Sequence, residues 1–329
     1  MTNRVTIETL AGWLAAQDDI VLLGHVSPDG DTTGSCLGLW HALKAMGKRV
    51  VACLPGGVSK LYAALPGASQ VVPTGEPLPF EPAAALSVDV SDYERLGEAG
   101  MALFERCPHR AAMDHHATNP GFGELMVLDG RAAAVGEMAV SLIEAMGVRL
   151  SREMAECLFV AISTDCGQFS YSNTRRETFE AAGKCVEAGI DLAGITEALY
   201  RTRTLSRTRL LARVLSGIEI SEDGRMAWAR LTEAMLRECG ATWEENEGIV
   251  NYLREIEGVE FGMLVEQRGD KTKLSMRSGK RLDVANAVAA PLGGGGHHSA
   301  AGALLDADME SAIRQALTLA RAALEGVHP

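Results

Sequence analysis

The segment "HVSPDGDTTGS", residues 25–35, directly follows the apolar run "IVLLG", residues 20–24. A short apolar run that ends in glycine predicts a buried strand of a parallel sheet. His25, Asp29 and Asp31 would then follow the carboxyl end of that strand, where open α/β sheets bind their ligands. Aspartate and glycine are also the ordinary residues of tight turns. The segment alone therefore leaves two interpretations open: a turn whose glycines let the chain bend tightly, and a site for metal ions.

Several familiar motifs are excluded. The segment begins like an EF-hand calcium loop, but the twelfth position counted from Asp29 is Trp40, where such a loop requires a glutamate. The chain contains no GxxxxGK(S/T), no GxGxxG after a predicted strand, no HExxH and no GxSxG. These absences argue against a P-loop nucleotidase, a dinucleotide-binding enzyme, a zincin and a serine hydrolase.

Short apolar runs alternate with amphipathic helical patterns from residue 20 to about residue 189, which predicts an α/β domain with a largely parallel sheet. The predicted strands are "IVLLG", "RVVACL" (49–54), "AALSVDV" (84–90), "RAAMD" (110–114) and "ELMVLD" (124–129). The predicted helices include "GSCLGLWHALKAMG" (34–47), "SREMAECLFVAIS" (151–163) and "TRRETFEAAGKCVEAG" (174–189).

The pattern changes after residue 215 and predicts a smaller α+β domain. Its predicted strands are "GIEIS" (217–221), "RMAWARL" (225–231), "VEFGMLVEQ" (259–267) and "KTKLSMRS" (271–278), and its helices are "WEENEGIVNYLREI" (243–256), "DVANAVAAPL" (283–292) and "DMESAIRQALTLARAAL" (308–324). Residues 191–215 have helical spacing and predict a connector, although they could instead be the last helix of the first domain. We therefore expect domains at 1–190 and 216–329 joined by a helical linker at 191–215.

The overall composition limits the class of protein. The 329 residues carry a formal net charge of −12, which disfavours binding of long nucleic acid through counterion release. The seven cysteines form no CxxC pair, which favours a reducing compartment, and most of them are expected to be buried. The first residues do not have the pattern of a signal peptide, and no apolar run reaches the length of a membrane span. We expect a soluble protein of the cytoplasm.

Acidic and imidazole side chains follow several of the predicted elements, not only the first strand. Each acid alone could be a helix N-cap or a turn residue. Together, carboxylates and imidazoles without thiolates favour a site for manganese or magnesium over structural zinc. Besides the opening segment, the candidates are Asp89 and Asp92 after "ALSV", Asp114, His115 and His116 after "RAAM", and Asp165 after an apolar helix.

Five motifs occur in an order that resembles one known superfamily. They are "HVSPDGDTTGS", "VDVSDYERLG", "MDHH", "STDCGQFSYSNT" and "GGGGHHSAAG". From about residue 18 to 325 the chain is similar to the DHH phosphoesterases, and within them to the bacterial oligoribonuclease and pAp-phosphatase group. The resemblance implies a catalytic DHH domain and a DHH-associated substrate domain with a cleft between them. A homodimer would not be unusual for this group.

The resemblance also implies roles for individual residues around two manganese ions, with magnesium or cobalt as alternatives. Asp89 would bridge the ions, and a hydroxide held between them would attack phosphorus. His116 would contact the scissile phosphate, and Asp114 would orient the histidines. His25, Asp29 and Asp89 would hold one ion, and Asp31, Asp89, His115 and Asp165 the other.

Two segments of the second domain match substrate-binding motifs of these phosphoesterases. In "SMRS" the resemblance assigns Arg277 and Ser278 to the substrate, and a guanidinium group suits phosphate. In "GGGGHHSAAG" it assigns Gly294, Gly295, Gly296 and His297. Without the resemblance, the basic residues of 268–281 could be the solvated edge of a hairpin, and the glycines a flexible turn.

We therefore expect a manganese-dependent phosphoesterase that hydrolyses very short RNA and linear dinucleotides such as pGpG and pApA to mononucleotides. The same resemblance extends the expected substrates to 3′-phosphoadenosine 5′-phosphate (pAp), which would yield AMP. Two alternatives are an inorganic pyrophosphatase or exopolyphosphatase, and a catalytically idle nucleotide-binding regulator. No expected ligand is missing from the sequence, which disfavours the idle regulator. We expect no partnership with long nucleic acid or membrane.

Overall fold

A computed structural model describes residues 3–326, apart from the side chain of His297. The contacts divide the chain into two compact units, with the division between Arg201 and Thr202. This division lies inside the segment that the sequence predicts to be a connector. That segment consists of α7 (Leu192–Thr196), the π-helical η4 (Glu197–Arg201) and α8 (Leu205–Leu215).

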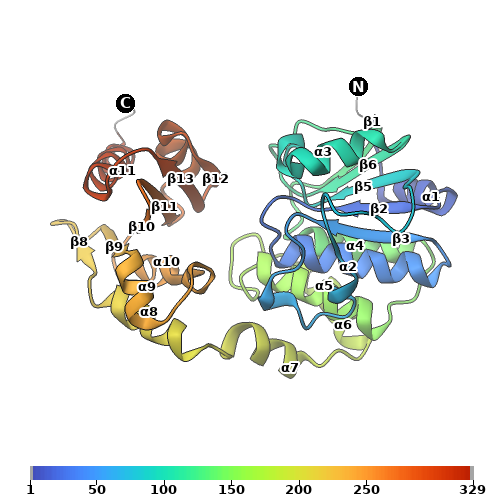
Figure 1. Ribbon diagram of the computed structural model, residues 1–329, viewed down its shortest axis with the longest axis horizontal. Coiled ribbons are helices and arrows are strands. Elements are labelled where there is room, and N and C mark those ends of the chain that lie inside the picture. Colours follow the sequence, from blue (N-terminus) through green and yellow to red (C-terminus); the bar gives the residue numbers. More distant parts are fainter. Residues whose placement is uncertain (1–2, 327–329) are drawn as a thin grey trace. The chain divides into compact units, whose positions relative to one another are not determined.

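The first unit is built on a seven-stranded sheet in which every pairing is parallel, as predicted. The strand order is β1-β7-β6-β5-β2-β3-β4 (Figure 1). All five predicted strands are confirmed, as β2 (Ile20–Leu23), β3 (Val50–Leu54), β5 (Ala84–Val88), β6 (His109–Asp114) and β7 (Leu125–Leu128). The edge strands β1 (Asn3–Arg4) and β4 (Val72–Pro73) were not predicted.

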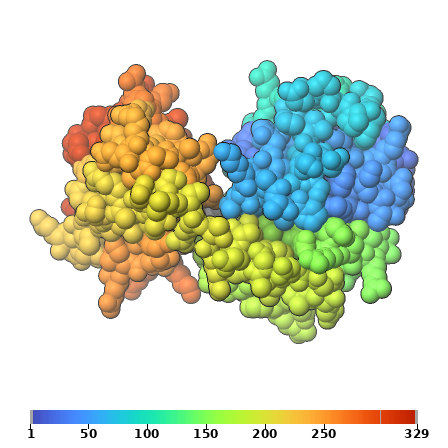
Figure 2. Space-filling view, turned by 60° about the horizontal axis from the view of Figure 1, so that its bottom comes forward, coloured from blue at the N-terminus to red at the C-terminus, as the bar shows by residue number. Residues whose placement is uncertain are grey.

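Helices cover both faces of this sheet. Ile20 and Leu22 of β2 pack in a core with one group of helices, whereas Val21 and Leu23 pack on the opposite side. On the face that Figure 2 shows, the blue-to-green residues of this unit form a continuous surface. The first group comprises α1 (Ile7–Ala16), α2 (Gly30–Ala45), α4 (Val135–Ala145), α5 (Arg152–Asp165) and α6 (Arg176–Glu187), and α3 (Gly97–Arg106) covers the other face (Figure 1).

The opening segment is not a glycine turn, because α2 already begins at Gly30. Asp29 is the N-cap of this helix, and its carboxylate accepts a hydrogen bond from Thr32 N at 3.0 Å. A Cβ at Gly34 would lie 2.3 Å from a backbone oxygen of α5, and one at Gly38 would lie 2.6 Å from Leu158. The expected bend at the glycines is therefore wrong, and the left-handed φ of this segment, +58°, belongs to Ser27. These two glycines let α2 and α5 pack closely together.

The second unit contains a six-stranded mixed sheet with the order β12-β13-β11-β10-β9-β8. Phe261, Met263 and Val265 of β10 pack in the core under α11, whereas Leu264 packs on the other face under α8 to α10. The strands are β8 (Glu219–Ile220), β9 (Met226–Leu231), β10 (Phe261–Arg268), β11 (Lys271–Ser278), β12 (Gly295–His297) and β13 (Ala300–Leu305). The helices are α9 (Glu233–Cys239), α10 (Ile249–Arg254) and α11 (Met309–Leu324), with a π-helical turn at Ala285–Ala289.

The "GGGG" segment enters a strand and is not only a flexible turn. Residues 295–297 form β12, which pairs antiparallel with β13. Gly294 lies against β13 so closely that a Cβ there would be 2.0 Å from Gly302 O, and Gly296 has a φ of +150°. Two of these glycines are therefore required by the fold.

Two further expectations can be compared with the structure. All seven cysteines are buried and unpaired, as predicted. Among residues 3–326, no helix is long and apolar enough to cross a membrane.

Candidate metal centre

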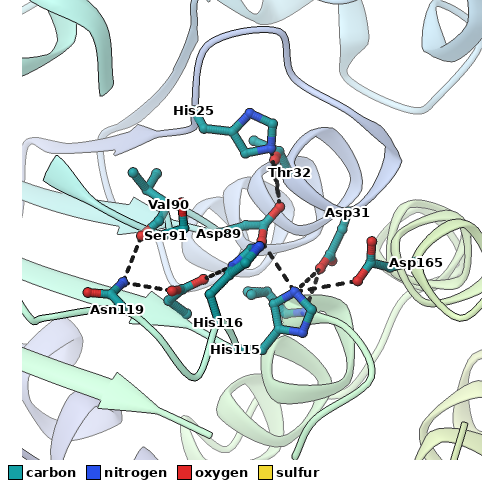
Figure 3. Close-up of polar contacts among 12 residues, drawn as sticks. His25, Asp31, Thr32, Asp89, Val90, Ser91, His115, His116, Asn119 and Asp165 are labelled. Atoms are coloured by element: carbon teal, nitrogen blue, oxygen red, sulfur yellow. Dashed lines mark hydrogen bonds and ion pairs between the residues drawn. The ribbon is translucent and has the colours of Figure 1, made fainter. Parts of the chain in front are cut away.

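The structure brings His25, Asp31, Asp89, His115 and Asp165 together in the first unit (Figure 3). His25 follows β2, Asp89 follows β5 and His115 follows β6, so three of them lie beyond the carboxyl ends of neighbouring strands. Asp31 lies in the first turn of α2, and Asp165 is the last residue of α5. Strand ends of a parallel sheet and two packed helices therefore converge on one point.

The side chains form overlapping groups of potential ligands. Within each group the ligand atoms lie within 4.8 Å of one another. Ligands on opposite sides of one octahedral cation are separated by about 4.2 Å, so these spacings suit metal coordination with small adjustments. The groups are His25 with Asp29 and Asp89, Asp31 with His115 and Asp165, and Asp89 with His115 and His116.

Backbone carbonyl groups favour one protonation state in two of the histidines. His25 Nδ1 can donate to Val26 O at 2.8 Å, although Arg95 Nη2, itself a donor, lies 3.1 Å from the same Nδ1 and 3.4 Å from the same carbonyl. His115 Nδ1 donates to Ala132 O at 3.0 Å. In the neutral ring, Nε2 then carries the lone pair that a metal needs.

These Nε2 atoms face carboxylate oxygens. His25 Nε2 lies 3.5 Å from Asp29 and 3.6 Å from Asp89. His115 Nε2 lies 3.4 Å from Asp165 and 3.7 Å from Asp89. A lone pair that faces an anion is unfavourable, so each Nε2 must either carry a proton or face a cation, and this geometry suits a cation.

Asp31 is held by neutral donors. Its carboxylate accepts hydrogen bonds from Val135 N at 2.6 Å and Gly136 N at 2.9 Å, at the N-terminus of α4, and from Ser35 Oγ at 3.0 Å. The helix terminus adds a partial positive charge that favours an anion. Asp31 is therefore fixed in position by groups that do not neutralise it, while burial raises its pKa above the ordinary value.

Asp89 is almost fully buried and has the left-handed φ of +60°. Thr32 Oγ1 donates to its Oδ2 at 2.6 Å, whereas its buried Oδ1 receives no hydrogen bond from the residues described. Burial, followed by the charges of Asp31, Asp29 and Asp165, raises the pKa of Asp89 well above its ordinary value. Backbone strain and an unsatisfied carboxylate oxygen are typical of functional sites.

The crowded negative charge also raises the pKa values of Asp165 and His115. Burial and the charge of Asp31 raise the pKa of Asp165 to about 8. Burial alone would lower the pKa of His115, but the charges of Asp31 and Asp165 outweigh it and raise this pKa. The site therefore favours positive charge at its centre. Its oxygen and imidazole donors fit divalent cations such as manganese or magnesium.

His116 and Asp114 form a separate arrangement beside these ligands. His116 Nδ1 donates to Asp114 Oδ1 at 2.8 Å. Asn119 Nδ2 donates to Asp114 Oδ2 at 2.6 Å and to Val90 O at 2.8 Å, as Figure 3 shows for Asn119 and Val90. Asp114 thus sets the ring orientation of His116, and Asn119 sets Asp114.

The candidate substrate residues lie in the second unit. Arg277 Nε donates to Asn251 Oδ1 at 3.1 Å, and Arg277 is paired across the sheet with Ala300, which is paired in turn with the backbone of His297. Ser278 points to the other face and is buried, and its Oγ donates to Leu282 O at 2.7 Å. The side chain of His297 lies outside the described part of the structure. Of the glycines, Gly295 faces open space, whereas Gly294 and Gly296 contact β13.

Sequence reasoning did not identify Thr32, Ser35 and Asn119 as residues of the site. Thr32 and Ser35 lie in the same segment as Asp29 and Asp31, so their proximity in sequence was a signal. Asn119 follows His116 by three residues, but nothing in that spacing indicates a bond to Asp114.

Comparisons with known proteins identify relatives of both units. Residues 19–162 match the DHH family, N-terminal domain, and residues 229–326 match the DHHA1 domain. The bifunctional oligoribonuclease and PAP phosphatase NrnA of Thermus thermophilus is 34% identical over 93% of this chain and 90% of its own length. The protein of the same name from Bacillus subtilis is 26% identical over 88% of this chain and 90% of its own length.

Solved structures show the same fold. An exopolyphosphatase-related protein from Bacteroides fragilis has a TM-score of 0.89 and 28% identity, and the match covers 97% of this chain and 95% of that one. RecJ from Thermus thermophilus in complex with Mn²⁺ has a TM-score of 0.55 and 14% identity, covering 98% of this chain and 54% of that one. The ordered motifs, the two matched domains and the long alignment to these relatives lead to one conclusion: the chain belongs to the DHH family.

Proposed function

We propose that this chain is a metal-dependent phosphoesterase that hydrolyses very short RNA and linear dinucleotides to mononucleotides, and pAp to AMP. One observation carries the proposal: two groups of ligands meet at the buried carboxylate of Asp89. His25 and Asp29 form a group with Asp89 itself, and His115, 3.7 Å from Asp89, also belongs to the group of Asp31 and Asp165. The names of the relatives, oligoribonuclease and PAP phosphatase, support the substrate class.

The residues of this chain have distinct tasks in that reaction. When bound, two divalent cations lower the pKa of water and neutralise charge that develops at the phosphoryl group. Asp89 would contribute to both cations, and the hydrogen bond from Thr32 keeps its carboxylate oriented. The hydrogen bond from His116 Nδ1 to Asp114 orients the ring, so we assign its Nε2 to an oxygen of the scissile phosphate.

Manganese is the ion that we propose, with magnesium or cobalt as alternatives, because the donor set mixes imidazole nitrogen with carboxylate oxygen. We assign Arg277 and the backbone of residues 294–297 to the distal part of the substrate. The net charge of −12 supports a short substrate, since an acidic surface repels a long polyanion. The unpaired cysteines support a reducing compartment such as the cytoplasm.

The test is hydrolysis by the full chain after removal of metal with EDTA and addition of Mn²⁺. We expect 5′-labelled pApA to be converted to mononucleotide, and pAp to release phosphate. Asp89→Ala and His116→Ala should abolish both activities while the melting temperature shows a folded protein. Absence of mononucleotide from the wild type at any Mn²⁺ concentration would refute the proposal.

A second candidate, an exopolyphosphatase, is favoured by the likeness to the exopolyphosphatase-related protein from Bacteroides fragilis. Polyphosphate and pyrophosphate therefore belong in the same assay at matched concentrations. Turnover of either that equals the turnover of pApA would favour this second function.

A further inference from the structure

An ion pair with a buried acidic partner lies behind the metal centre. Glu137, in the first turn of α4, is 7% exposed, and its Oε1 accepts a hydrogen bond at 2.5 Å from Nη2 of Arg175, whose side chain is 26% exposed. Its Oε2 accepts from Thr178 Oγ1 at 2.9 Å and from Ala133 N at 3.3 Å. Every contact of this carboxylate is thus made either by the segment that precedes α4 or by the start of α6.

The segment that Glu137 holds, residues 132–136, contacts the metal centre directly. Ala132 O orients the ring of His115, and the amides of Val135 and Gly136 bind the carboxylate of Asp31. These contacts come from backbone atoms. Their positions therefore depend on what fixes the backbone, and Glu137 is bonded to the amide of Ala133 in the middle of the segment.

The other side of the pair continues the chain that follows Asp165. Arg175 is the N-cap of α6, ten residues after Asp165. Between them, Asn173 Nδ2 donates both to Ala133 O and to Asp165 O, each at 3.2 Å. The pair therefore ties the backbone that supports Asp165 to the backbone that supports His115 and Asp31.

The other ligands are supported by different elements. His25 is oriented by Val26 O, Asp29 by Thr32 N, and Asp89 by Thr32 Oγ1. None of these contacts involves residues 132–136 or the start of α6. A buried ion pair also gives little net stability, since removing its charges from water offsets much of their attraction. The placement of the pair is better explained by orientation than by stability.

We propose that Glu137 and Arg175 are positioning residues for one cation only, the one held by Asp31, His115 and Asp165. The inference rests on the proposed two-cation centre. Loss of the pair should loosen residues 132–136 and lower the affinity for that cation. The affinity for the cation of His25 and Asp29 should not change. Residues that support metal ligands in this way typically change metal affinity by about 10- to 100-fold.

The experiment is a calorimetric titration of the EDTA-treated full chain with Mn²⁺. The wild type should bind two ions. The binding event that Asp165→Asn weakens is the one that belongs to the cation of Asp31, His115 and Asp165. Glu137→Gln should weaken the same event about tenfold or more and leave the other within about twofold. A double variant, Glu137→Gln with Asp165→Asn, should lose little beyond Asp165→Asn alone, because both changes act on one site.

A matched control exists on the same two helices. Glu144 of α4 and Lys184 of α6 form an exposed ion pair at 2.7 Å. Glu144→Gln removes the same charge from the same helix and should leave both Mn²⁺ binding events unchanged. Equal weakening by Glu137→Gln and Glu144→Gln would overturn the inference.

Two variants separate positioning from folding. The double variant Glu137→Met with Arg175→Met removes both charges, so its melting temperature should stay close to that of the wild type. Its affinity for the cation of Asp31, His115 and Asp165 should nevertheless be lower than that of the wild type. If Glu137→Gln does not fold, Thr178→Val gives the reading instead: it removes the hydrogen bond to the same carboxylate, together with the one that Thr178 Oγ1 accepts from Arg175 N. Wild-type affinity for both ions in these folded variants would refute positioning. Failure of the wild type to bind Mn²⁺ would refute the metal centre itself, which is a different result.

Discussion

Replacement of Thr32 by valine tests how the central carboxylate is held. Thr32 is fully buried, and its Oγ1 donates to Asp89 Oδ2 at 2.6 Å. Valine has nearly the same shape, so the change removes this hydrogen bond and little else. A hydrogen bond to a charged group is worth about 1.5–3 kcal/mol, which corresponds to roughly a 10- to 150-fold change in an equilibrium constant.

We expect Thr32→Val to weaken Mn²⁺ binding by an amount in this range and to raise the Mn²⁺ concentration needed for half-maximal hydrolysis of pApA. Thr33→Val is the matched control. Thr33 is the next residue along α2 and is equally buried, but its Oγ1 has no hydrogen-bond partner among the residues described. Thr33→Val should therefore leave Mn²⁺ affinity unchanged and keep or raise the melting temperature. Mn²⁺ affinity of Thr32→Val within twofold of wild type would refute the reasoning.

Three further predictions follow from the site and its supports. Asn119→Ala removes the amide that holds Asp114 and should lower kcat about tenfold or more with Mn²⁺ affinity unchanged; an equal loss of Mn²⁺ affinity would contradict it. Burial and neighbouring carboxylates raise the pKa of Asp165 from 3.8 to about 8, so its contribution to the stability of the metal-free fold is most favourable below pH 4 and is lost as the pH rises toward 8. In EDTA the melting temperature of the wild type relative to that of Asp165→Asn should therefore fall over this range, and a difference that does not change with pH would argue against the charge cluster. Gly34→Ala, whose Cβ would lie 2.3 Å from a backbone oxygen of α5, should lower the free energy of unfolding by about 1–3 kcal/mol, whereas Gly183→Ala, with open space around it, should not.

The sheet of the first unit could be predicted from the sequence because the middle of each central strand is a short, mainly apolar run that is buried on both faces. Ile20 and Leu22 enter one core and Val21 and Leu23 the other, so no polar residue interrupts the run. The edge strands β1 and β4 have two residues each, which is too short for any periodicity.

The start of α2 was misplaced because Asp, Gly and Thr are common in turns and equally common at helix N-termini. Two glycines of this helix serve its packing against α5, which is separated from it by more than one hundred residues. Local patterns cannot show which distant backbone approaches a glycine. The ligand types were readable from the residues, but their arrangement around Asp89 depended on this packing.

The supports of the ligands could not be read from the sequence for the same reason. Asp31 is held by Val135 N and Gly136 N, 104 and 105 positions away along the chain. Backbone amides carry no sequence signature, since any residue except proline supplies one. A side-chain motif therefore identifies the ligands of such a centre, but not the groups that orient them.

The choice of supporting groups has a physical consequence for metal binding. Within residues 3–326, no lysine or arginine forms an ion pair with Asp31, Asp89 or Asp165. Neutral donors take that place, namely two amides and a serine hydroxyl at Asp31 and a threonine hydroxyl at Asp89. A neighbouring ammonium or guanidinium group would stabilise the carboxylates but would also compete with a divalent cation for their charge. Neutral donors fix the oxygens and leave the negative charge uncompensated, so the cost of crowding these three carboxylates is relieved when protons or cations bind. The same repulsion that destabilises the metal-free centre therefore increases its affinity for metal.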